Sequence, residues 1–107
     1  MNPDSSQKRI AFGYNREYNN IVINNGQAII VEAIYTQYQR GYGIGIIKEI
    51  LEKAGVPSPQ NKRTWGKQTI SNILSNPHYT GIDGYPQIIT QEVFAEVQKN
   101  KVERSTH

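Results

Sequence analysis

The chain has 107 residues, a net charge of +3 and a hydrophobic fraction of 36%, values that fit one small globular domain. It has no cysteine, which excludes disulfide bonds, thiol nucleophiles and cysteine-based zinc sites. The isoelectric point of about 9.2 permits nucleic-acid binding, although many domains with other functions reach this value.

No apolar run approaches the roughly 20 residues that span a bilayer, and the polar N-terminus lacks the apolar core of a signal peptide. We therefore expect a cytoplasmic protein without a membrane partner. Its only imidazoles are His78 and the final residue His107. A metal site is thus not expected, and no cofactor is predicted.

The N-terminal part of the sequence predicts a tail followed by a β-hairpin. Residues 1–8 show no periodicity and are expected to form a flexible tail. Two short runs of alternating apolar residues then predict antiparallel strands, and the polar run 15–20 between them is expected to connect the strands. The alternating apolar residues are Ile10, Phe12, Tyr14, Ile21 and Ile23.

A first helix is predicted to begin near Asn24 or Asn25. Asn24 and Gln27 form a capping-box pattern, in which each side chain binds the backbone amide of the other residue. Gly41 supplies the left-handed conformation that ends many helices. One face of this helix carries apolar residues at helical spacing: Ile30, Val31, Ile34, Tyr35 and Tyr38.

A second helix is predicted over residues 44–54. Gly55 is expected to end it, and Pro57 and Pro59 predict that an extended loop follows. The loop is polar and basic as far as Thr64. The apolar residues expected to face inward are Ile46, Ile47, Ile50 and Leu51.

A third, short helix is predicted over residues 67–75. Trp65 and Ile70 are spaced to pack across its start as a hydrophobic staple. The pair Asn76-Pro77 ends it, because proline disfavours helical geometry in the residue before it.

The C-terminal part predicts a turn and a fourth helix. Asp83-Gly84 is typical of a tight turn. The helix is expected to run from Thr90 to about Lys101, with a second staple between Ile89 and Phe94.

Together these elements predict a mainly helical α+β fold. A short N-terminal β-hairpin would join about four helices in a helix-turn-helix-like, or winged-helix-like, arrangement. We expect one domain over residues 9–102 and a flexible C-terminal tail over residues 103–107.

The third helix carries the most informative polar residues. Its apolar stripe would anchor it through Ile70, Ile73 and Leu74, which leaves hydrogen-bonding side chains on the other face. Lysine binds guanine or phosphate, and glutamine and asparagine can bind adenine through two hydrogen bonds. Any solvated surface helix can show the same pattern, so spacing alone leaves both interpretations open. The outward residues are Lys67, Gln68, Ser71, Asn72 and Ser75.

The loop before this helix is far longer than the 3–4-residue turn of a simple helix-turn-helix. Its residues Lys62 and Arg63 suit contacts to phosphates, which set register without reading sequence.

Catalysis finds no support in the residue pattern. No serine lies in a nucleophile-elbow pattern or beside an identifiable base, and the glycine-rich residues 41–45 lack the lysine of a P-loop. His78 beside Tyr79 is interpreted as a structural residue. The chain is therefore not expected to be an enzyme.

Several stretches resemble the recombinase domain of large serine recombinases, in order along residues 9–100. The most specific is Trp65, followed by the third helix and by Asn76-Pro77-His78-Tyr79-Thr80-Gly81. The resembling stretches are 10–14, 39–45, 47–51, 54–59, 64–70, 73–81, 86–94 and 97–98.

In that family the domain follows a resolvase-type catalytic domain, often precedes a zinc ribbon, and binds one half of an attachment site. The resemblance implies that the third helix faces DNA and that the long loop and the turn after Asn76 approach the DNA backbone. The residues expected to contact DNA are Lys62, Arg63, Lys67, Gln68, Thr69, Ser71, Asn72, Ser75, His78 and Tyr79.

The sequence also departs from the family pattern. It contains neither the catalytic domain nor the cysteines of a zinc ribbon. Family members often carry arginine at the positions of Ser71 and Asn72, and they commonly have a longer insert between Gly81 and Pro86. The first difference weakens the argument for phosphate binding, and the second indicates a trimmed or diverged wing.

The leading hypothesis is a sequence-specific double-stranded DNA-binding module of a large serine site-specific recombinase, from a phage, an integrative element or a bacterial chromosome. Its partners would be an attachment site, the catalytic resolvase domain that this chain lacks, and other copies in a homo-oligomer of the parent protein. It would act in the bacterial cytoplasm, at the nucleoid. The alternative is a protein–protein interaction domain of the recombination complex with little DNA binding of its own.

Overall fold

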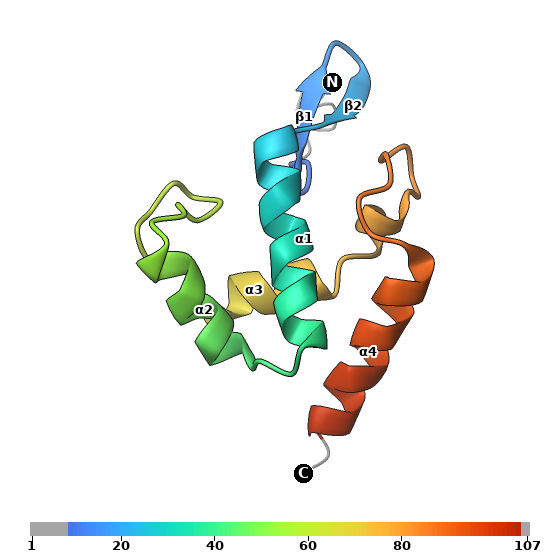
Figure 1. Cartoon of the computed structure of the whole chain (residues 1–107). Helices are drawn as coiled ribbons and strands as arrows, with labels where there is room; N and C mark the ends of the chain where they lie inside the picture. The colour runs from blue at the N-terminus through green and yellow to red at the C-terminus, as the bar shows by residue number, and fades with distance from the viewer. Residues whose placement is uncertain (1–8, 106–107) are drawn as a thin grey trace, which may run out of the picture.

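The computed structural model describes residues 9–105, and over that span it confirms the predicted mainly helical fold with an N-terminal hairpin (Figure 1). Helix α1 stands at the centre, with α2 on one side and α4 on the other, and it also packs against α3 and β1. None of the helices in this span is both long and apolar enough to cross a membrane. The elements are β1 (Tyr14–Glu17), β2 (Asn20–Ile23), α1 (Asn25–Gln39), α2 (Ile44–Lys53), α3 (Lys67–Leu74), the 3-10 helix η2 (Pro77–Thr80) and α4 (Gln91–Ser105).

The hairpin lies later in the sequence than expected. Its antiparallel ladder runs from the pair Tyr14 and Ile23 to the pair Glu17 and Asn20, so the strands occupy most of the polar run that was expected to connect them. Tyr18 opens the short turn in a left-handed conformation, with φ of 56°, as tight hairpin turns require.

The expectation that Ile10 and Phe12 belong to a paired strand is therefore wrong. Both side chains pack against the core while their backbone lies before the ladder. An extended segment that places alternate side chains on a core has the same period of two as a paired strand, which explains the error.

The start of α1 forms only half of the predicted capping box. Asn24 Oδ1 accepts from the Gln27 backbone N–H at 3.0 Å, as expected. Gln27 Oε1, however, accepts from the Gly13 N–H at 2.8 Å, and the Asn24 N–H donates to Gly13 O at 2.9 Å. The cap thus joins the helix to the segment that leads into β1. At the other end, Gly41 has a φ of 101°, and its predicted role in ending the helix is confirmed.

Helix α2 buries less of its apolar surface than predicted. Ile47 and Leu51 are buried, but Ile46 is 45% exposed and Ile50 is 39% exposed, so the inward orientation expected for these two is wrong. The helix packs against α1 and α3, and no other described element covers its remaining face.

Helix α4 continues to Ser105, beyond the end expected near Lys101. The Arg104 guanidinium lies 3.8 Å from the centre of the Tyr38 ring and donates to the backbone oxygens of Tyr38 at 2.8 Å and Tyr42 at 3.3 Å. These contacts hold the end of α4 on the C-terminal end of α1. Residues 103–105 of the expected C-terminal tail are thus helical, while residues 1–8 and 106–107 of the two expected tails lie outside the described residues.

Tyr79 of η2 joins distant parts of the chain. Its hydroxyl donates to Phe12 O at 2.6 Å, and its own backbone oxygen accepts from the N–H groups of Ile88 and Ile89 at 2.8 and 2.9 Å. The side chain is only 1% exposed. One buried residue therefore connects the N-terminal segment, η2 and the segment before α4.

Three of the four buried tyrosines, Tyr14, Tyr35 and Tyr79, form an aromatic cluster in the core. The Tyr79 ring stacks on Tyr14 and meets Tyr35 edge-on. The Tyr14 hydroxyl donates to Pro86 O at 2.7 Å, and the Tyr35 hydroxyl donates to Ile73 O at 2.8 Å. Burial, with a smaller repulsion from Tyr85, raises the pKa of Tyr14 to about 12. Burial also raises the pKa values of Tyr35 and Tyr79 well above the ordinary value of a tyrosine.

This cluster predicts alkaline unfolding. A tyrosine in the unfolded chain ionises near pH 10, whereas the folded chain keeps Tyr14 neutral to about pH 12. The contribution of the neutral, buried tyrosines to the free energy of unfolding is therefore complete below pH 10. Above it, each of these tyrosines should lower the free energy of unfolding by about 1.4 kcal/mol per pH unit. Urea titrations followed by circular dichroism from about pH 8 to about pH 12 measure this slope. The Tyr14→Phe variant should show a shallower slope, and equal slopes would contradict the prediction.

Candidate nucleic-acid interface

Helix α3 is held by three buried residues, Ile70, Ile73 and Leu74, as the apolar stripe predicted. It packs against α1, α2 and α4, so the opposite side of the helix turns outward. The polar residues predicted for that side divide into two groups. Lys67, Gln68, Asn72 and Ser75 are exposed, while Thr69 and Ser71 are half-buried.

Two of the exposed residues bind each other. Gln68 Nε2 donates to Asn72 Oδ1 at 2.8 Å, one helical turn away. This hydrogen bond fixes two long polar side chains side by side on the outer face of α3, which lowers the entropy that a ligand contact would cost.

Lys67 opens the same helix on the side of α2. A Cβ placed on Gly45 would lie 3.7 Å from Lys67 Nζ, so the lysine side chain lies along the start of α2. Lys67 has no ion-pair partner among the described residues. Its ammonium group is therefore available to an anion.

The loop between α2 and α3 is closed at its base. Glu52 Oε2 accepts from the Trp65 backbone N–H at 2.7 Å and from Lys48 Nζ at 2.5 Å. The Trp65 indole N–H donates to Val56 O at 2.8 Å. The ammonium of Lys48 and then the Trp65 amide hold the pKa of the Glu52 carboxyl below its usual value.

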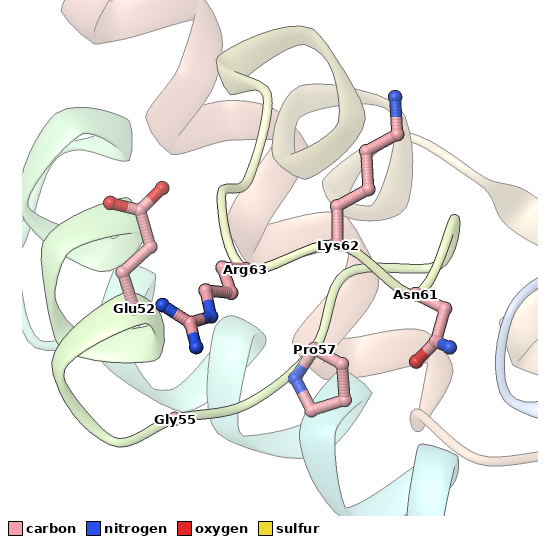
Figure 2. Close-up of a pocket in the computed structure, with 6 residues that line it drawn as sticks. All are labelled: Glu52, Gly55, Pro57, Asn61, Lys62 and Arg63. Atoms are coloured by element: carbon pink, nitrogen blue, oxygen red, sulfur yellow. The ribbon is translucent and has the colours of Figure 1, made fainter.

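Lys62 and Arg63 are both exposed on this loop. They line a hollow of about 490 Å³, in which Arg63 extends beside Glu52 while Lys62 points away from it (Figure 2). The buried Ser58 fixes the loop from inside, because its Oγ accepts from the Lys62 N–H at 3.1 Å. The complete lining is Glu52, Gly55, Pro57, Asn61, Lys62 and Arg63.

A second hollow, of about 200 Å³, lies directly beside the outer face of α3. Its neighbour, of about 430 Å³, shares four of its lining residues, so the two hollows adjoin at the N-terminal segment. The shared residues are Ala11, Phe12, Pro59 and Gln60, and Thr69, Asn72, Ile73, Asn76 and Tyr79 complete the lining of the smaller hollow. The α2–α3 loop, the N-terminal segment and α3 therefore meet around the smaller hollow. Residue spacing gave no signal for this juxtaposition.

A lysine side chain that the sequence did not indicate lies at the end of α3. Lys101 Nζ of α4 donates to the Ser75 hydroxyl. His78 lies in the following turn, with its Nε2 at 3.1 Å from Asp83 Oδ2 and its ring stacked on Tyr85 at 4.4 Å. Ser75 and His78 thus already have partners within the chain. Lys101 reaches this surface only through tertiary packing.

Tyr79 contributes to the lining of the smaller hollow but is almost fully buried. Its hydroxyl donates to Phe12 O, so the hydroxyl proton is already used within the chain. Its neighbour His78 remains partly exposed. Across residues 9–105, no group of three acidic or histidine side chains could hold a metal ion.

A family model described as Recombinase matches residues 25–104. Several solved chains, including the following two, share the fold. One belongs to a crystal structure of an LSR–DNA complex, with a TM-score of 0.78 and 23% identity, over 94% of this chain and 36% of that chain. The other comes from work on the sequence requirements of the Listeria innocua prophage attP site, with a TM-score of 0.73 and 23% identity, over 91% of this chain and 44% of that chain. This chain thus spans less than half of either. No curated protein matches.

The hydrogen bonds that Glu52 accepts at the base of the α2–α3 loop predict that the effect of Glu52→Gln on stability depends on pH. The variant removes the charge that binds Lys48 and the Trp65 amide, so its free energy of unfolding at pH 7 should be lower than that of the wild type. Because the folded pKa of Glu52 is lowered, the difference should disappear as the pH falls from the usual value of 4.5 through that lowered pKa.

Chemical denaturation from neutral to acidic pH measures this difference. Glu49→Gln, at an exposed residue of the same helix, is the matched control and should change little. A Glu52→Gln effect that persists unchanged in acid would show that the carboxylate charge is not the cause.

Proposed function

This chain belongs to the recombinase-domain family, the DNA-binding domain of large serine recombinases, and from this we propose that it is a double-stranded DNA-binding module that recognises one half of an attachment site. The observation that carries the proposal is that Asn72 on the outer face of α3 and the α2–α3 loop line the same hollow. A related fold occurs in an LSR–DNA complex, which supports this assignment.

The surface offers two kinds of contact. Lys62, Arg63 and Lys67 present exposed cations for phosphate oxygens, and such contacts position a protein on the duplex without reading its sequence. Gln68 and Asn72 present amides, which suit base edges in the major groove. We assign affinity chiefly to the first group and sequence preference to the second.

Strand cleavage is assigned to another part of the parent recombinase. The matched family is the DNA-binding domain, and the 107 residues include no resolvase-type catalytic domain. Because a single module makes few contacts, we expect micromolar or weaker affinity for an isolated half-site, with tighter binding from several linked modules in an oligomer.

One observation favours a protein partner as a second function. Ile46 and Ile50 lie one turn apart on α2, Tyr42 lies in the short connection that precedes this helix, and each of the three is at least 39% exposed. Exposed apolar groups that form a continuous patch often mark protein contacts. Self-association of the chain without salt-dependent DNA binding would favour this function over the first.

The test is a titration of the chain against a randomised duplex library by fluorescence anisotropy, at about 50 and about 200 mM salt. Wild-type affinity should fall steeply with salt, because each phosphate contact releases counterions. The double variant Lys62→Ala/Arg63→Ala should lose affinity. Its slope of log affinity against log salt should be shallower by about 1.8, which is 0.9 for each lost phosphate contact.

The matched control is Arg40→Ala/Lys99→Ala, which also removes two positive charges, at exposed positions at the end of α1 and on α4. It should keep the wild-type slope. Equal losses in the two variants would indicate an effect of net charge alone. No binding at low salt by the folded wild type would overturn the proposal.

A further inference from the structure

We infer that Gln68 and Asn72 act as one unit that reads the major-groove edge of an adenine, and that the hollow beside Asn72 receives the methyl group of a thymine. The inference rests on the proposed function, since it requires α3 to face the major groove. It goes further by naming the base pair that the surface selects.

The hydrogen bond between the two amides determines what they can offer to a base. Gln68 Nε2 donates to Asn72 Oδ1, which leaves the Gln68 oxygen and the Asn72 amide N–H groups as the principal free groups. If the oxygen and nitrogen of both amides were exchanged, the residues would swap roles and one free oxygen and one free –NH₂ group would remain. The unit therefore always presents one acceptor and one donor.

Adenine is the base that matches this pattern. Its major-groove edge carries the N6 amino donor beside the N7 acceptor. Guanine presents two acceptors, N7 and O6, so one of them would face the free amide oxygen. Cytosine offers only its amino group, and thymine only its O4 acceptor and a methyl group. A fixed donor and acceptor pair thus favours adenine over the other three bases.

The hollow provides a second, independent match to an A·T pair. Asn72 lies at its edge, and its wall includes the apolar residues Ala11, Phe12 and Pro59. The backbone of Phe12 is held by the Tyr79 hydroxyl at 2.6 Å, and its ring meets Trp65 edge-on at 6.2 Å, so this wall is preformed. The 5-methyl group of thymine is the apolar feature of the major groove and is small enough for a hollow of about 200 Å³.

The first experiment selects duplexes from a randomised library with the wild type, Gln68→Ala, Asn72→Ala and the control Gln91→Ala. Gln91 is an exposed amide at the start of α4. The wild type and the control should select a common motif with a fixed A·T pair. Both α3 variants should still bind but accept other pairs at that position, with a loss of discrimination of roughly tenfold.

The second experiment changes single atoms of the selected duplex. Replacing the adenine with 7-deazaadenine removes the N7 acceptor and should weaken wild-type binding by roughly tenfold, with little effect on Asn72→Ala or Gln68→Ala. Replacing the thymine with uracil removes only the methyl group and should weaken wild-type binding by about fourfold, as expected for one buried carbon.

The outcomes separate this inference from the proposed function. Salt-dependent binding with a base preference that survives in Gln68→Ala and Asn72→Ala, or with guanine at the position they control, would overturn the inference alone. An unchanged affinity for both the 7-deazaadenine and the uracil duplex would also overturn it. Failure of the wild type to bind any duplex at low salt would overturn the proposed function and this inference together.

Discussion

The hydrogen bonds of Tyr79 are the constraint on which the arrangement of this small domain depends. The hydroxyl fixes Phe12 and the backbone oxygen fixes Ile88 and Ile89, so three segments far apart in the sequence meet at one residue. An unsatisfied hydroxyl at this depth would cost about 1–3 kcal/mol, a large part of the stability of a small domain. Because η2 follows directly after α3, the same contacts set the end of the helix that carries the interface.

Local interactions made much of the fold predictable. The Asn24 cap, the stop at Gly41 and the burial of Trp65 and Ile70 at the start of α3 follow from residues within one or two turns of each other. The position of the paired strands could not be predicted from such local interactions, because an extended segment that packs on a core has the periodicity of a strand. The exposure of Ile46 could not be read from the sequence either, because helical spacing identifies an apolar face without showing whether another element covers it.

The candidate interface also combines features that could be predicted from the sequence with features that could not. The exposure of Gln68 and Asn72 follows from helical spacing against a buried stripe, and their mutual hydrogen bond follows from their separation of four residues. The hollow beside them requires Phe12 to lie next to α3, and the contact of Lys101 with Ser75 requires α4 to cross the same helix. Such contacts join residues distant in sequence, so they depend on how the helices pack.

The closed base of the α2–α3 loop has a consequence for how such domains diverge. Glu52, Trp65 and Val56 hold the two ends of the loop together without help from the exposed tip at residues 59–63. Since the entropy of closing a loop grows only slowly with its length, the tip can be replaced or lengthened at little cost to the helices. The phosphate contacts proposed for Lys62 and Arg63 can therefore be changed, in evolution or by design, through the five residues of the tip while α3 keeps its position.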